Sequence, residues 1–152
     1  MKPVNLSVTE KTAYVLTLAG AVPFLAAGLL VWLETPITPG QFGQAATSYA
    51  AVILSFLGGI QWGTGLSVAG SAPKSSRNLL ILSVVPSILA CGILFIDPVS
   101  IRIYGAIGLF VAVWAVDALL RLQGLITDWF FRVRSLATGI VVGSLASISI
   151  RL

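Results

Sequence analysis

Five long apolar stretches, separated by short polar segments, occupy most of this chain. Each holds roughly the 20 mainly apolar residues that an α-helix needs to cross the ~30 Å hydrocarbon layer of a membrane. Because the apolar residues run continuously and do not alternate with polar ones, the pattern disfavours a membrane β-barrel. It predicts membrane-spanning helices over residues 14–33, 45–68, 78–96, 101–122 and 133–150.

The composition supports a membrane protein over a soluble one. Apolar residues make up 57% of the chain and charged residues only 9%, whereas soluble domains carry about 25% charged residues. The mean hydropathy is +1.02. We therefore expect an all-α polytopic membrane protein, a bundle of five transmembrane helices that forms one integral membrane domain over residues 1–152. Its surroundings are the lipid bilayer.

The positions of the basic residues predict the orientation of this bundle. Lys and Arg are enriched in cytoplasmic loops, and seven of the nine fall on one side of the predicted topology: Lys2, Lys11, Lys74, Arg77, Arg121, Arg132 and Arg134. We expect the N-terminus in the cytoplasm and the C-terminus outside. The residues before the first apolar stretch do not resemble an organelle transit peptide. A multi-pass protein of the bacterial cell inner membrane is the simplest interpretation.

Two rows of small residues are candidates for close helix packing. Small residues four positions apart let helices approach closely in lipid, where van der Waals contact drives association. The second predicted helix has such a row at Ser55, Gly59 and Gly63, and the fifth has Gly139 and Gly143. We expect both rows to pack inside the bundle. The alternative is that one row forms a homodimer.

Polar residues inside the apolar stretches form the candidate site. The predicted fourth helix carries Trp114, Asp117 and Arg121 on one face, and the second carries Gln61 and Trp62. The predicted topology brings these residues toward the cytoplasmic side, where Arg132 and Arg134 begin the fifth helix.

Three interpretations of this cluster remain open. An ionised carboxylate in hydrocarbon needs a partner, so Asp117 could pair with Arg121 or Arg134 and fix the helix orientation. Alternatively, Arg121, Arg132 and Arg134 could bind an anionic headgroup or a polar ring between walls formed by Trp62 and Trp114, since buried indoles need a partner for their N–H. The third interpretation is a proton or ion path. Gln61 by itself is typical of interhelical hydrogen bonding.

The residue types that are missing narrow the chemistry. The chain has no histidine and a single cysteine, which disfavours haem, zinc and iron–sulfur sites and any Ser-His pair. No basic stripe with interleaved aromatics indicates nucleic-acid binding. We therefore predict no metal, no cofactor, no nucleic-acid partner and no enzyme activity.

Two segments resemble a known family. Tyr49 to Gly63 reads YAAVILSFLGGIQWG, and Asp117 to Leu136 places Trp129, Arg132 and Arg134 before the last helix. Both are similar to a family of uncharacterised small bacterial inner-membrane proteins that has a mitochondrial transmembrane relative in animals. In that family a histidine often occupies the position of Gln61. The resemblance implies the fold and the membrane location, and it implies no mechanism.

Two functions follow as hypotheses. The first is a non-catalytic membrane protein that binds a lipid, a quinone or another apolar ligand, or assists a membrane protein complex, at the polar site near the cytoplasm. The second is a small transporter or channel that uses the Asp117 region. The absence of a visible inverted repeat weighs against the second.

Overall fold

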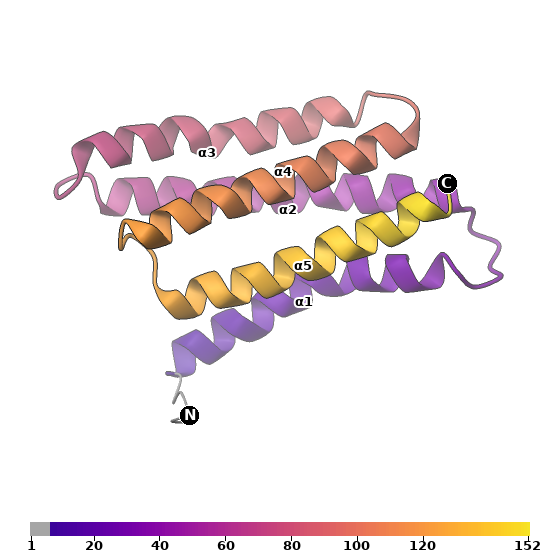
Figure 1. Ribbon diagram of the computed structural model, residues 1–152, viewed down its shortest axis with the longest axis horizontal. Helices are drawn as coiled ribbons and strands as arrows, with labels where there is room; N and C mark the ends of the chain where they lie inside the picture. The colour runs from indigo at the N-terminus through magenta and orange to yellow at the C-terminus, as the bar shows by residue number, and fades with distance from the viewer. Residues whose placement is uncertain (1–6) are drawn as a thin grey trace.

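The computed structural model describes residues 7–152, and within them the chain forms five α-helices that lie side by side in one bundle (Figure 1). Each is long and apolar enough to cross a membrane. The predicted polytopic five-helix fold is therefore confirmed. The helices are α1 (Val8–Leu30), α2 (Pro39–Ser67), α3 (Pro73–Ile93), α4 (Val99–Leu122) and α5 (Asp128–Ile150).

Every helix begins before its apolar stretch does, and α1 and α2 show why. Ser7 caps α1 and Thr38 caps α2, each accepting a hydrogen bond from the backbone N–H three residues later. The side chains of Glu10 and Gln41 bond back to the two cap residues and complete capping boxes. Because these bonds satisfy N–H groups that would otherwise be free, the helices extend into polar first turns. Counting apolar residues therefore placed the starts too late, at residues 14 and 45.

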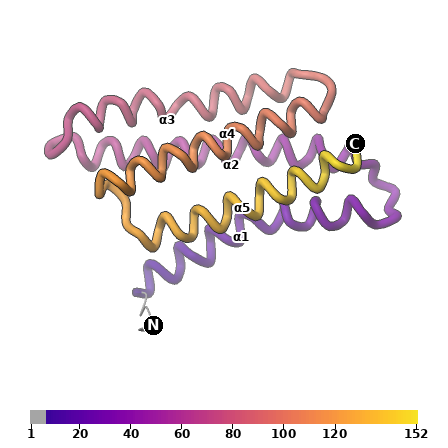
Figure 2. The backbone as a smooth tube through the Cα atoms, viewed as in Figure 1, coloured from indigo at the N-terminus to yellow at the C-terminus, as the bar shows by residue number. Residues whose placement is uncertain are grey.

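The spatial order of the helices differs from their order in the chain. The first helix, α1, packs mainly on the last, α5, and meets α2 only sparsely, while α2 packs extensively on α3. Figure 2 shows α1 and α5 running together. The structure places the start of α1 at the same end of the bundle as the α2–α3 and α4–α5 connections, and α5 ends at the opposite end. The side of the membrane that each end faces stays a prediction.

Close helix approach depends on glycines outside the predicted rows. A Cβ at Gly58 of α2 would collide with the backbone carbonyl of Ser83 on α3. A Cβ at Gly28 of α1 would lie 2.9 Å from the Cα of Ser144 on α5. Both positions therefore require glycine, because the neighbouring backbone occupies the space of a side chain.

The predicted packing of the small-residue rows inside the bundle is wrong. On α2, Ser55, Gly59 and Gly63 are exposed on the outer surface, and within residues 7–152 a Cβ at either glycine would meet nothing within 4 Å. The same holds for Gly139 and Gly143 of α5, which border a shallow groove beside α1. The α2 row is displaced by one position from the face that packs on α3. Its role in a homodimer stays a prediction.

Aromatic side chains fill the centre of the bundle. Phe24 of α1 packs edge-on against Phe110 of α4, with ring centroids 5.8 Å apart, and lies 5.0 Å from the ring of Tyr49 on α2. The hydroxyl of Tyr49 donates a hydrogen bond of 3.1 Å to the carbonyl of Gly20. These contacts join α1 to α2 and α4, and Gly20, Tyr49 and Phe110 also line the cavity described below.

Candidate functional site

Three polar side chains from three helices meet inside the bundle. Gln61 of α2 donates from Nε2 to Oδ1 of Asp117 on α4, over 3.2 Å. Arg134 of α5 donates from Nε to Oδ2 of the same carboxylate, over 3.1 Å. The side chains of Arg134 and Asp117 are each only 6% exposed. The carboxylate therefore accepts a hydrogen bond on each oxygen, and its charge is balanced by the guanidinium.

This arrangement resolves the choice of partner for Asp117. Of the two pairings predicted from the sequence, the structure forms the one with Arg134. Arg121 instead donates to Asp128 over 2.7 Å and lies over the ring of Phe131, 5.0 Å from its centroid. An acidic residue in the first turn of α5 thus pairs with the arginine in the last turn of α4. Arg121 is held at the end of the bundle, away from Asp117.

The remaining predicted site residues do not join the cluster. Arg132 is exposed on α5. Trp62 is 44% exposed on the outer surface of α2. Trp114 donates from Nε1 to the hydroxyl of Ser135 over 2.9 Å and stacks on Phe131. The structure therefore brings together Gln61, Asp117 and Arg134, and it does not place the two tryptophans as walls of a common pocket.

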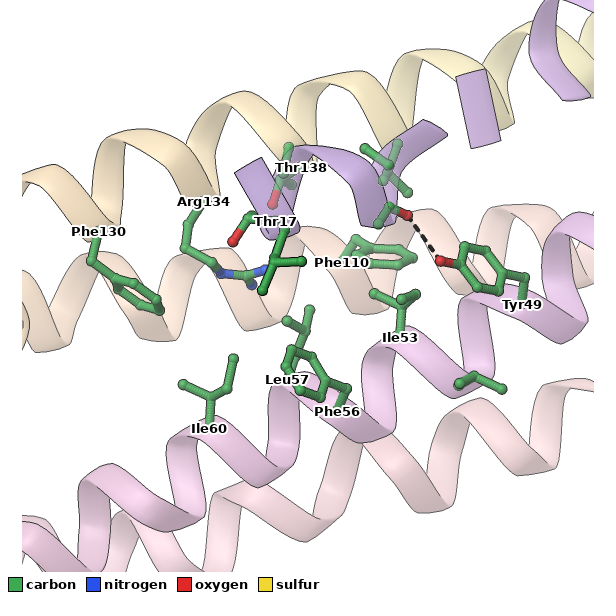
Figure 3. Close-up of a pocket in the computed structure, with 16 residues that line it drawn as sticks. Thr17, Tyr49, Ile53, Phe56, Leu57, Ile60, Phe110, Phe130, Arg134 and Thr138 are labelled. Carbon is green, nitrogen blue, oxygen red and sulfur yellow. Dashed lines mark hydrogen bonds between the residues drawn. The ribbon is translucent and has the colours of Figure 1, made fainter. Parts of the chain in front are cut away.

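A cavity of about 360 Å³ lies next to this cluster, between α1, α2, α4 and α5. Figure 3 shows it with Phe110 and Leu57 near its middle, Tyr49 toward one end, and Arg134 and Thr138 toward the other. Most of its wall is apolar. Three lining side chains are also exposed on the outside of the bundle, namely Leu16, Val52 and Phe56.

Those three side chains locate the mouth of the cavity. Leu16 belongs to α1, whereas Val52 and Phe56 belong to α2, the pair of helices that meets sparsely. An opening between two membrane-spanning helices faces the hydrocarbon of the bilayer when the bundle is inserted. The cavity is therefore accessible sideways, from the lipid.

Two buried polar atoms at the cavity wall lack a hydrogen-bond partner within residues 7–152: Nη2 of Arg134 and Oγ1 of Thr138. These residues lie one helical turn apart on α5, on the face that also carries Phe130, Ala137 and Val141. Two nitrogens of the Arg134 guanidinium therefore differ in their surroundings. Its Nε is bound to Asp117, whereas its Nη2 is buried without a partner among residues 7–152, in a side chain that lines the cavity.

Sequence reasoning identified Arg134 and missed Thr138. The helix face could have been recognised, because helical spacing places on it Phe130, Arg134, Ala137, Thr138 and Val141. A threonine in an apolar helix gives no distinct signal, however, since its hydroxyl commonly bonds to the backbone of its own helix.

Comparison with known proteins agrees with this fold. A family model described as "Protein of unknown function (DUF3429)" matches residues 9–150. The chain belongs to this family. It is also similar to Transmembrane protein 69 of Xenopus tropicalis, with 35% identity over 137 residues, or 89% of this chain and 52% of that protein. The chain thus spans about half the length of that relative. No solved structure matches it. The family resemblance noted in the sequence is confirmed.

Proposed function

We propose that this protein is a non-catalytic membrane protein that binds an apolar small molecule in the cavity between α1, α2, α4 and α5. The observation that carries the proposal is a cavity of about 360 Å³ with a mainly apolar wall. Its volume falls within the roughly 300 to 1,000 Å³ range of small-molecule sites, which combine apolar walls with a few placed polar groups. Arg134 and Thr138 supply those groups here.

The position of the mouth favours a ligand that is itself dissolved in the membrane. The exposed lining residues Leu16, Val52 and Phe56 open the cavity toward lipid. A lipid or a quinone reaches such an opening by lateral diffusion, without leaving the hydrocarbon. A small hydrophilic solute would first have to enter the bilayer.

Binding is better supported than transport through the Asp117 region. Both carboxylate oxygens of Asp117 are engaged, one by Gln61 and the other by Arg134. A carboxylate that carries protons or ions has to release its partners in each cycle. Here, breaking the buried pair would leave uncompensated charge, at about 3 to 5 kcal/mol. This favours a structural role for Asp117.

The bacterial cell inner membrane and a cytoplasmic N-terminus remain part of the proposal. Their support is the concentration of basic residues at one end of the bundle: Lys11, Lys74, Arg77, Arg121 and Arg132 all lie toward the end where α1 begins. Cytoplasmic loops carry this excess.

A variant with a larger side chain in the cavity wall tests the proposal. Gly20 borders the cavity, and within the described chain a Cβ there meets nothing within 4 Å, so Gly20→Leu places a side chain in open space. Gly108→Leu is the matched control, because Gly108 is equally open but lies on α4 outside the cavity.

Native mass spectrometry of gently extracted protein supplies the readout. We expect the unmodified protein and Gly108→Leu to carry a small apolar molecule, and Gly20→Leu to lose it. A ligand-free unmodified protein, or equal occupancy in Gly20→Leu, would overturn the proposed function.

A further inference from the structure

The hydroxyl of Thr138 behaves differently from comparable hydroxyls in the bundle. Thr47 donates to the carbonyl of Gly43 and Ser144 donates to the carbonyl of Ile140, each four residues earlier and each over 2.8 Å. That bond is the usual solution for a hydroxyl inside an apolar helix. Thr138 is 8% exposed, and its hydroxyl has no such bond to any of residues 7–152.

Arg134, one helical turn earlier on α5, also has an unpartnered donor. Its Nη2 is buried without a partner in the described chain, while its Nε is fixed by Asp117. A buried polar group without a hydrogen bond is unfavourable, and more so in a membrane, where no bulk water is available to it. The guanidinium can only donate, so a molecule that satisfies Nη2 must offer an acceptor, and the hydroxyl of Thr138 can donate to the same acceptor.

We propose that Arg134 and Thr138, which both line the cavity, turn Nη2 and Oγ1 toward it and bind the carbonyl oxygen of a neutral amphiphile, either the ring carbonyl of a quinone or the ester carbonyl of an acyl lipid. This inference rests on the proposed function, because it concerns the ligand of the same cavity. It adds which end of the ligand is recognised and by which two atoms.

The charge balance of the cluster selects a neutral ligand. Asp117 already compensates the guanidinium, and Gln61 occupies the other carboxylate oxygen. An anionic group next to Arg134 would bring one uncompensated negative charge into a cavity with an apolar wall, which is strongly unfavourable. A carbonyl oxygen accepts hydrogen bonds without adding charge.

The depth of the donors agrees with this choice. Arg134 lies six positions after the start of α5 at Asp128, which is about 9 Å along the axis at 1.5 Å per residue. Phosphate headgroups lie outside the hydrocarbon layer, whereas ring and ester carbonyls sit closer to it. With Asp128 at the membrane boundary, the donors lie inside the hydrocarbon layer, where a neutral carbonyl is favoured over a charged phosphate.

The apolar part of the ligand has a path to follow. From Arg134 and Thr138 the cavity continues past Leu57 and Phe110 toward Tyr49 (Figure 3). A ring or a short acyl segment fits along these side chains. A longer chain leaves between α1 and α2, at the opening toward the lipid.

Matched probes separate recognition of the carbonyl from simple apolar binding. Decylbenzoquinone and decylbenzene share a tail and a six-membered ring but differ in the carbonyls, and dioctanoylglycerol supplies ester carbonyls without charge. Dissociation constants are measured by titration calorimetry of the full-length protein in detergent. Each variant is compared through the ratio of its affinities for two probes, so partition of the probes into micelles cancels.

Thr138→Val removes one donor and keeps the shape of the side chain. We expect it to weaken carbonyl binding about fivefold, the effect of one neutral hydrogen bond, and to leave decylbenzene unchanged. The double variant Arg134→Met, Asp117→Asn removes the other donor without leaving an unpaired charge, and it keeps an acceptor for Gln61. We expect it to weaken carbonyl binding more than about tenfold.

The outcomes distinguish the two proposals. Tighter binding of decylbenzoquinone or dioctanoylglycerol than of decylbenzene, with dependence on Thr138, supports the inference and identifies the source of the carbonyl. Equal ratios in the unmodified protein and Thr138→Val overturn the inference, and the two atoms are then satisfied by water. If Gly20→Leu also leaves binding of every probe unchanged, the proposed function fails as well.

Discussion

Arg134 of α5 donates a hydrogen bond of 3.1 Å from Nε to Oδ2 of Asp117 on α4, and both side chains are almost completely buried. The pair joins adjacent helices at the level of the cavity wall. Gln61 of α2 adds a third helix to the same carboxylate.

Removing one partner of this pair is expected to destabilise the bundle strongly. Asp117→Asn or Arg134→Met alone leaves one buried charge without compensation, so each should lower the free energy of unfolding by about 3 to 5 kcal/mol. The double variant should lose clearly less than the sum. Thermal unfolding in detergent measures all three.

The exposed pair between Arg121 and Asp128 is the control for that experiment. Its side chains are 43% and 66% exposed, so Asp128→Asn should change the unfolding free energy by less than about 1 kcal/mol. Equal effects of Asp128→Asn and Asp117→Asn would contradict the importance of the buried pair.

Thr138→Val is expected to stabilise the ligand-free protein. The hydroxyl has no partner among residues 7–152, and valine has the same branched shape, so the change removes an unsatisfied polar group and should contribute roughly 1 kcal/mol. Thr47→Val is the matched control. Its hydroxyl is bonded to the carbonyls of Gly43 and Gln44, so stability should fall by up to about 1 kcal/mol.

Unfolding of both threonine variants is followed in detergent after delipidation. A loss of stability in Thr138→Val comparable to that in Thr47→Val would show that the hydroxyl of Thr138 is satisfied within the folded protein. No free donor would then remain at Thr138 for a carbonyl ligand.

Two adjacent glycines of α2 are expected to respond in opposite ways. Gly58→Ala forces a methyl group against the Ser83 backbone of α3 and should destabilise the protein by about 1 to 3 kcal/mol. Gly59→Ala points into open space in the described structure and should stabilise α2 by roughly 0.5 to 1 kcal/mol, because alanine favours the helix. Unfolding in detergent compares the two variants, and a destabilised Gly59→Ala would indicate that this face has a partner.

The loops at the two ends of the bundle test the orientation. In a Cys91→Ser background, Ser71→Cys lies between α2 and α3, and Thr35→Cys lies between α1 and α2. We expect an impermeant thiol reagent applied to intact cells to label Thr35→Cys and to spare Ser71→Cys, since basic residues flank the Ser71 end. The reverse pattern would invert the predicted topology.

The sequence was sufficient to predict the number of helices, because lipid imposes a minimum apolar length on each crossing. It was insufficient to predict the buried face of α2. Gly58 and Gly59 are both small and apolar, and only the position of Ser83 on a neighbouring helix makes one of them a contact. In a membrane the outer surface is as apolar as the interior, so hydrophobicity does not distinguish the two faces.

The candidate site was predictable only in part. Asp117 had to find a cationic partner, and its pairing with Arg134 was one of two alternatives. Arg121 was misplaced because the predicted fifth helix began at residue 133 and left out Asp128, which lies in the first turn of α5 and pairs with Arg121. The cavity depends on the gap between α1 and α2, and no residue pattern in either helix encodes that gap.

The pairing of α1 with α5 has a consequence for biogenesis. Gly28 accepts a hydrogen bond from Ser147, which in turn accepts one from Trp32, so the far end of α1 is tied to the last helix. During synthesis α2 and α3 can associate as soon as both have left the ribosome, whereas α1 must wait for its main neighbour until α5 has been made. Of these five helices, the first to be made is therefore the last to be fixed in the bundle.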